Sequence, residues 1–202
     1  MELKGSTSTA FHYCHDDDQA SSSAIGILKG LIEQLLSHNR QLLPPCYTRC
    51  TSSGEPVLRS LSQATRLLDD LCTLLPKIYI VVDGLDECEQ VERKQTMDAL
   101  LDVVTHCEKV DPGKLRVLIV SQNLADIKRV LYSSSQARPA TQTIQLSDQD
   151  NKGDIHLYVK KWVERIAVKF SPFSNEFKEY LQRLTVHNAR GSFPRSGQFT
   201  CD

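Results

Sequence analysis

The sequence has few aromatic residues, few glycines and prolines, and no excess of charge of either sign. Aromatic side chains make up 6% of the 202 residues, and glycine and proline occur 9 and 8 times. This scarcity of glycine and proline excludes collagen-like and low-complexity chains. The 24 Lys and Arg side chains nearly balance the 25 Asp and Glu side chains, so charge gives no basis for binding a nucleic acid or an anionic membrane.

Long apolar runs are absent as well. The run at 78–82 is among the longest, and it is far shorter than the roughly 20 residues needed to cross a bilayer. Residues 1–10 lack the hydrophobic stretch of a secretory signal, and no Asn-x-Ser/Thr acceptor site for glycosylation occurs. The cysteines are irregularly spaced and odd in number, seven in all, which is typical of reduced thiols. We therefore expect an intracellular, cytoplasmic protein that has no signal peptide and no transmembrane segment.

Alternating apolar patterns predict an α/β fold. Continuous β-branched runs indicate buried strands, and apolar residues three and four positions apart indicate helices. Strands are expected at 9–14, 78–82, 117–120 and 143–146, and helices at 22–36, 56–75, 91–107, 127–131, 154–166 and 177–184. Because strands and helices alternate, the sheet is expected to be mainly parallel with helices on both faces, in three layers.

Proline and β-branched residues also predict where elements end and how deeply they are buried. Pro44 and Pro45 are expected to close the first helix, because proline cannot continue a helix. A second helix is expected from about Pro56 to Leu75. The strand at 78–82 is a continuous apolar run, so it is expected to be buried on both of its faces.

The pattern of apolar residues changes beyond Ser147. Residues 1–150 are expected to form the α/β core, and residues 151–190 a small helical subdomain. Residues 191–202 show no periodicity and are expected to be an irregular tail.

Three carboxylates follow the strand at 78–82: Asp83, Asp86 and Glu87. Ligands of open α/β sheets bind beyond the carboxyl ends of the strands. Asp83 is placed to hold Mg²⁺ through its water shell, and Asp86 or Glu87 to position or deprotonate an attacking water. Gly84 lets the backbone turn without a side chain that would obstruct a phosphate. Alternatively, these acids only cap the following helix at its positive end.

The string Ile-Val-Val-Asp-Gly-Leu-Asp-Glu-Cys, which ends at Cys88, resembles the Walker B segment of NACHT-type STAND NTPases. The resemblance is strongest to the fungal members whose domain is similar to the N-terminal domain of nephrocystin. Further segments are similar to family motifs and follow in the same order: 10–14, 22–36, 115–122, 154–159 and 184–191. The resemblance therefore runs from about residue 9 to residue 191. It implies a P-loop-NTPase-like sheet, with a helical subdomain after it.

The sequence departs from the family at the phosphate-binding loop. Walker A needs Gly-x-x-x-x-Gly-Lys-Ser/Thr, whose backbone N–H groups and lysine hold the phosphates. The only Gly-Lys here is Gly113-Lys114, and Leu115 follows it. The family's Thr-Ser-Arg-Pro is replaced by Val-Ser-Gln-Asn, so the uncharged Gln122 stands where the family has arginine. We therefore expect a sheet that lacks its first strand, the one that carries Walker A.

The resemblance implies a role in signalling. Complete members bind Mg-ATP and hydrolyse it slowly, which switches them between closed and open states, with sensor repeats downstream and an effector upstream. The residues carried over are Asp83 (Mg²⁺ through water), Ser121 (Mg-nucleotide), and Asp86 and Glu87 (water positioning). Without Walker A, this chain alone is expected to bind no cofactor and to lack activity as an enzyme.

Two other interpretations of the whole chain remain open. The first is a non-catalytic interaction module that pairs with protein partners, such as an intact homologue, through exposed sheet edges. The second is a truncated gene copy with no function of its own. Neither predicts nucleic-acid or membrane binding, because the charge is balanced and long apolar runs are absent.

Cysteine and histidine offer two weaker hypotheses. His12, Cys14, His15, Cys46 and Cys50 together suggest a zinc site, but they lack the tight ligand pairs that are typical of such sites. A nucleophilic cysteine beside Asp86 and Glu87 is disfavoured, because neighbouring carboxylates raise the pKa of a thiol.

Overall fold

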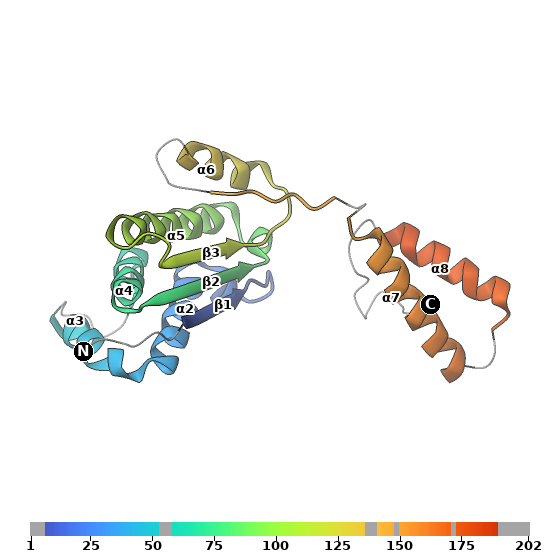
Figure 1. Ribbon diagram of the computed structural model, residues 1–202, viewed down its shortest axis with the longest axis horizontal. Helices are drawn as coiled ribbons and strands as arrows, with labels where there is room; N and C mark the ends of the chain where they lie inside the picture. The colour runs from blue at the N-terminus through green and yellow to red at the C-terminus, as the bar shows by residue number, and fades with distance from the viewer. Residues whose placement is uncertain (1–6, 53–57, 136–140, 148–149, 171–172, 190–202) are drawn as a thin grey trace. The chain divides into compact units, whose positions relative to one another are not determined.

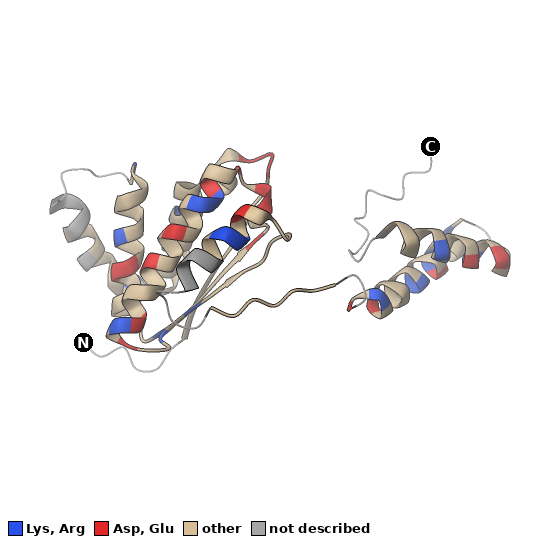
Figure 2. Cartoon of the chain, turned by 90° about the horizontal axis from the view of Figure 1, so that it is seen from above, with Lys and Arg blue, Asp and Glu red and all other residues tan. Residues whose placement is uncertain are grey.

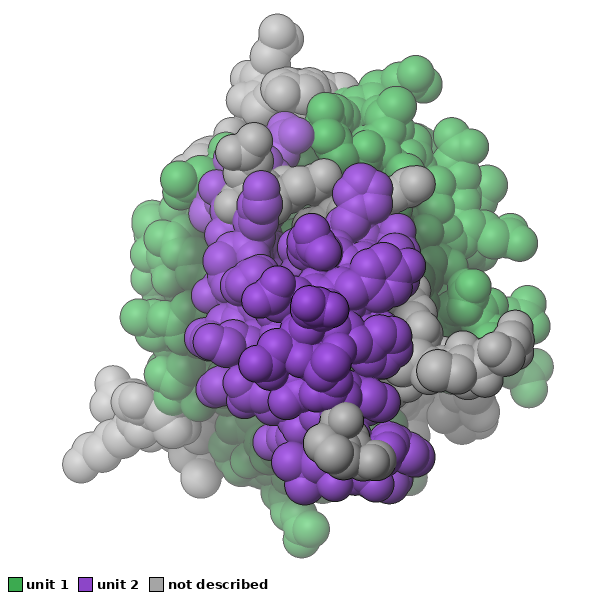
Figure 3. Space-filling model, turned by 90° about the vertical axis from the view of Figure 1, so that its right-hand side faces the viewer, with its two compact units in different colours: residues 1–142 green, residues 143–202 purple. Residues whose placement is uncertain are grey.

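The computed structural model describes residues 7–52, 58–135, 141–147, 150–170 and 173–189 (Figure 1). The chain divides into two compact units, residues 1–142 and 143–202, which Figure 3 shows in green and purple. Each unit has its own apolar core.

The first unit is built on a parallel sheet of three strands in the order β1-β2-β3 (Figure 1). The strands are β1 (Thr7–Tyr13), β2 (Lys77–Asp83) and β3 (Leu115–Ile119). In the register of β1 with β2, Tyr13 lies beside Asp83. The predicted α/β class, with a P-loop-like sheet, is confirmed, and three of the four predicted strands are present.

The helices of this unit separate the strands along the chain. They are α1 (Gln19–Ser22), α2 (Ala24–His38), α3 (Leu43–Ser52), α4 (Leu61–Leu74), α5 (Gln90–Val110) and α6 (Ala125–Ser135), with the short 3-10 helices η1 (Arg40–Leu42) and η2 (Leu85–Glu87). Serine hydroxyls start two of them: Ser23 Oγ accepts from the N–H of Gly26 in α2, and Ser60 Oγ from that of Gln63 in α4. These bonds satisfy N–H groups that have no partner within their helix.

Two predicted helix boundaries are wrong. Pro44 and Pro45 do not close a helix, because α2 has already ended at His38 and both prolines lie in the first turn of α3. Proline is tolerated there, since the N–H that it lacks would have no partner within the helix. The helix expected from Pro56 begins instead at Leu61, after the Ser60 cap; Pro56 itself lies outside the described residues.

The core lies on one face of the sheet. Ala10, Ile80 and Leu115 are buried with apolar residues of α2, α4, α5 and α6. Side chains on the opposite face are more exposed: Phe11 by 50%, Tyr79 by 38% and Leu118 by 57%. The prediction that the strand at 78–82 is buried on both faces is therefore wrong. Successive side chains of a strand point to opposite faces, and within the described part of the chain only one face of β2 is fully covered.

The strand predicted at 143–146 is absent. Residues 141–147 are described, but they pair with no strand, and Ile144 and Leu146 are 76% and 70% exposed. A strand exists only through hydrogen bonds to a neighbouring strand. The resemblance places the strand that carries Walker A between this segment and β3, and these 202 residues contain no such motif.

The second unit contains two helices, α7 (Lys152–Lys169) and α8 (Asn175–Ala189). Ile155, Val159 and Val163 form the buried stripe of α7, and Leu181 and Val186 of α8 pack against it. The tail predicted at 191–202 lies outside the described residues. None of the described helices is long and apolar enough to span a membrane.

Candidate functional site

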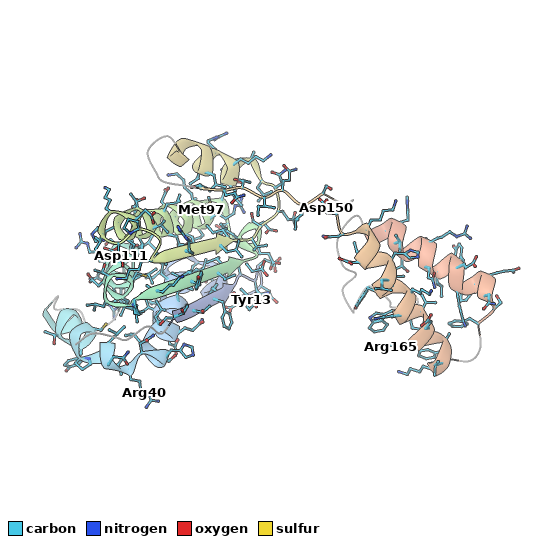
Figure 4. The ribbon with its side chains drawn as sticks, viewed as in Figure 1. Tyr13, Arg40, Met97, Asp111, Asp150 and Arg165 are labelled. Atoms are coloured by element: carbon cyan, nitrogen blue, oxygen red, sulfur yellow. The ribbon has the colours of Figure 1, made fainter. Side chains whose placement is uncertain are left out.

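The candidate residues gather beyond the carboxyl ends of β2 and β3. Tyr13, labelled in Figure 4, marks the same end of β1. Figure 2 shows acidic residues, coloured red, gathered in the loops at one end of this unit. Parallel strands bring their carboxyl ends to one edge of the sheet, so residues far apart in the sequence meet there.

Gly84 allows the chain to turn sharply after β2. Its φ is +74°, in the left-handed region, and a Cβ at this position would lie 3.1 Å from the carbonyl oxygen of Cys14. Glycine is therefore required both for the conformation and for the close approach. The turn leads directly into η2, which carries Asp86 and Glu87.

Asp83 ends the central strand β2. Asp83 is half-buried, on the same face of the sheet as Tyr79, and its backbone oxygen accepts the N–H of Cys14 at 2.9 Å. This bond continues the β1–β2 ladder one residue beyond the end of β1. Asp83 is thus fixed by the backbone at the position where the sequence predicts a carboxylate.

Asp86 joins the loop after β2 to the loop after β3. Its Oδ1 accepts the N–H of Gln122 at 3.0 Å, and the N–H of Leu85 donates to the carbonyl of Val120 at 3.3 Å. Ser121, on the second loop, donates from Oγ to the carbonyl of Gln122 at 3.1 Å. The fold therefore places the predicted residues Asp86 and Ser121 on loops that are bonded to each other.

The hydrogen bond between Gln122 and Asp86 tests the alternative that these acids only cap the next helix. The N-cap of α5 is Glu89, and its side chain makes no capping hydrogen bond. Asp86 bonds across to the neighbouring loop instead. Glu87 points to another element, with Oε2 3.8 Å from Nδ1 of His15.

Arg93 connects several segments at this edge of the sheet, and the sequence analysis did not identify it. Its Nε donates to Oδ2 of Asp126 at 2.8 Å, and a terminal guanidinium nitrogen donates to the carbonyls of Asp86 (3.2 Å) and Cys88. It therefore fixes η2 to α6. A signal was present in the sequence: a cation in the first turn of a helix opposes the helix dipole, so it needs acceptors from elsewhere.

The contact with Arg93 shifts the pKa of Asp126. Burial raises the pKa of Asp126, but hydrogen bonds from Arg93 and from backbone N–H groups outweigh burial, and the pKa is lowered overall. The side chains of Arg93 and Asp126 are 14% and 21% exposed, so water screens the pair only in part.

The described residues do not fit Mg-ATP by themselves. Within the described ranges, no three His, Cys, Asp or Glu side chains converge on a possible metal position, whether around Asp83 or around His12 and Cys14. The sequence also contains no glycine-rich phosphate loop. We therefore derive no chemical step through a bound nucleotide.

The first unit is a parallel α/β sheet of the P-loop-like class, and acidic residues lie beyond the carboxyl end of its central strand. These two features define the class of the protein. The family described as nephrocystin 3, N-terminal, matches residues 2–122, which include all three strands and all four candidate residues. The chain belongs to this family.

One relative is a fungal protein. Vegetative incompatibility protein HET-E-1 of Podospora anserina is 22% identical over 200 residues, which cover 95% of this chain but 14% of that protein. The chain thus spans a small part of its relative's length. No solved structure matches the chain with statistical significance. The predicted resemblance to nephrocystin-like, NACHT-type proteins is confirmed.

Proposed function

We propose that this chain is part of a NACHT-related signalling NTPase module, in which it supplies the Walker B strand but not the phosphate-binding loop. The observation that carries the proposal is the position of Asp83 at the carboxyl end of the central strand. In this proposal Asp83 holds the water shell of Mg²⁺, Ser121 lies near the nucleotide, and Asp86 and Glu87 orient water. The family membership supports the proposal.

On this proposal the 202 residues bind no nucleotide alone. The groups that grip phosphate in P-loop proteins are backbone N–H groups of a glycine-rich loop and its lysine, and the sequence has no such loop. A carboxylate at the Walker B position contributes only through a metal ion that the phosphates also hold. Asp83 therefore has no ligand to act on until a phosphate loop is supplied.

Isothermal titration of the purified protein with Mg-ATP tests this part of the proposal. We expect no heat of binding up to millimolar nucleotide. Micromolar affinity that Asp83→Asn abolishes would contradict it. Sequencing the transcript in both directions tests the rest, since a working module requires Gly-x-x-x-x-Gly-Lys-Ser/Thr upstream.

A second candidate function, a non-catalytic interaction module, rests on the two edges of the sheet. Gln34 closes the outer edge of β1 by bonding both backbone groups of Phe11. On β3, the N–H of Val120 donates to the carbonyl of Val82. Because the backbone groups of successive residues point alternately to the two sides of a strand, the N–H and the carbonyl of Val117 point away from β2. No other described residue bonds to these groups. An unpaired strand edge of this kind can accept a strand from another chain.

Sedimentation of the protein over a range of concentrations tests this second candidate. We expect association that Val117→Pro weakens, because proline removes one outward N–H. Thr9→Pro is the matched control on the closed edge, and it should leave association unchanged. Asp83→Asn separates the two candidates: it abolishes any ATP-dependent effect of a longer protein and leaves the association intact.

A further inference from the structure

A row of apolar side chains runs along one side of α8 and is exposed. Phe177 and Leu184 are each 43% exposed, and Tyr180 is 52% exposed. Phe173, which lies just before the helix and is partly exposed, extends the row at its start. We call these four side chains the α8 row.

The aromatic members of the α8 row contact one another. The ring centroids of Phe173 and Phe177 lie 5.0 Å apart in an edge-to-face arrangement, and those of Phe177 and Tyr180 lie 6.5 Å apart and are stacked. Both arrangements are favourable for aromatic pairs. The row is therefore one continuous apolar surface, whereas scattered exposed apolar residues would need no explanation.

The α8 row differs from the side of α8 that packs against α7. Leu181 and Val186 pack against the buried stripe of α7, which lies beside α8 in Figure 1. The members of the row within the helix remain exposed. A helix of a globular protein normally has one apolar side. The second apolar side of α8 therefore indicates a second partner.

The spacing of the α8 row is that of a helix that pairs with another helix. Its members are separated in turn by four, three and four residues, which is the spacing of the a and d positions of a heptad. In this register Glu176 and Arg183 occupy the g positions beside the row, and both are exposed. The e positions hold Ser174, Leu181 and Asn188, which carry no charge.

These charges indicate that the partner is a second copy of the same helix. In an antiparallel pair of identical helices, the g positions of one copy face those of the other. Glu176 of each copy then lies beside Arg183 of the other, and two-fold symmetry makes this favourable contact twice. In a parallel pair, g positions face e positions, so the same charges would face Leu181 and Asn188. The surface is self-complementary only in the antiparallel arrangement.

We propose that two copies of this chain associate through the α8 row, with the two α8 helices antiparallel and Glu176 of each copy paired with Arg183 of the other. Phe177 of one copy packs against Tyr180 of the second, and Leu184 packs against Phe173. The association removes the exposed apolar row from water. It involves the second unit, so it is independent of nucleotide binding and of the open edge of β3.

Sedimentation equilibrium of the 202-residue protein and of charge-reversal variants tests the proposal. We expect the mass of the unaltered protein to rise with concentration from that of one chain to that of two. Arg183→Glu sets two carboxylates against each other in both contacts, and it should raise the dissociation constant about tenfold. When Glu176→Arg is added to this variant, opposite charges meet again, and the double variant should associate like the unaltered protein.

Two further variants serve as a control and as a test of the apolar contact. Glu179→Arg reverses an exposed charge of α8 that lies outside the e and g positions, so it should leave the dissociation constant unchanged. Phe177→Ser removes an aromatic ring from both copies and should leave single chains at concentrations where the unaltered protein is paired.

Three results would each overturn the proposal. A protein that remains a single chain at every concentration would show that the α8 row does not bind a second copy. Association that Arg183→Glu leaves unchanged, or that the double variant does not restore, would exclude the antiparallel contact. Association that Val117→Pro weakens and Phe177→Ser does not would belong to the edge of β3 instead.

Discussion

The side-chain amide of Gln34 in α2 replaces a neighbouring strand along the outer edge of β1. Its Nε2 donates to the carbonyl of Phe11 at 2.7 Å, and its Oε1 accepts the N–H of the same residue at 3.0 Å. One helix side chain thus satisfies both backbone groups that an incoming strand would need. The two edges of the sheet therefore differ, with β1 closed at its centre and β3 open.

Removing this amide should weaken the fold and open the edge. We expect Gln34→Ala to lower the free energy of unfolding by about 1 kcal/mol, since both bonds are exposed to water. We also expect more self-association, measured by light scattering alongside urea unfolding. Gln41→Ala, at an exposed glutamine in η1, is the control and should change neither quantity. Equal behaviour of the two variants would show that Gln34 does not protect the edge.

The contact between Asp86 and Gln122 can be tested at a single amide. Asp86→Ala removes the acceptor, so hydrogen exchange at the N–H of Gln122 should become faster. Asp86→Asn keeps a carbonyl oxygen at the same place and should leave the exchange nearly unchanged. NMR exchange rates of the three proteins give the answer, and a Gln122 amide unaffected by Asp86→Ala would mean that the two loops are held together otherwise.

Arg93 should matter far more to stability than the lysine beside it. We expect Arg93→Ala to cost about 2–3 kcal/mol, because it leaves Asp126 and the carbonyls of Asp86 and Cys88 without their donor. Lys94→Ala breaks only an exposed pair with Asp98 and should cost under about 0.5 kcal/mol. Urea denaturation of both variants tests the difference, and equal losses would contradict it.

The lowered pKa of Asp126 adds a pH dependence to this prediction. A carboxylate whose pKa is lower in the folded state contributes stability above its unfolded pKa, near 3.8, and loses that contribution as pH falls through the folded value. Asp126→Asn should therefore be less stable than the unaltered protein at neutral pH, and the gap should close below about pH 4. Urea midpoints measured across that range check the sign, since a gap that widens in acid would exclude it.

His106 should show the opposite dependence on pH. Its hydrogen bond with Asp69, 2.8 Å long, raises the pKa of the imidazole above 6.5. The stabilisation is therefore complete below the unfolded pKa and disappears as pH rises through the folded one. We expect His106→Gln to lower the urea midpoint at about pH 5.5 and to have little effect at about pH 9. In the background of Asp69→Asn the substitution should have no effect at either pH.

Much of the fold was predictable from periodicity, and the errors share one cause. The strands β1, β2 and β3 were predicted because apolar runs and turn residues mark them locally. The segment 143–146 has the same local pattern, yet it is described and forms no strand. The prediction that β2 is buried on both faces was wrong at Tyr79 for the same reason. A local pattern shows that a segment can be buried or paired, but it does not show that a partner is there.

The candidate site was predictable in position but not in its bonds. Apolar residues followed by acids placed Asp83 and Asp86 beyond a strand end, and the structure has them there. The bond from Gln122 to Asp86 depends on the separate fact that β3 lies beside β2. Arg93 bonds to residues on both sides of it in the sequence, including one on α6, so no single spacing rule could have identified its partners.

The sequence by itself determined the α/β class, the helix start near Ser23, and the acidic end of the central strand. Each of these follows from the spacing and capping chemistry of residues close together in the chain. Only the tertiary structure decided which edge of the sheet is closed, and that the turn at Gly84 packs against Cys14. These features depend on the order of strands and on the helix that packs against each of them. Strand order is set by the total burial of apolar surface over the whole unit, which no local stretch of sequence contains.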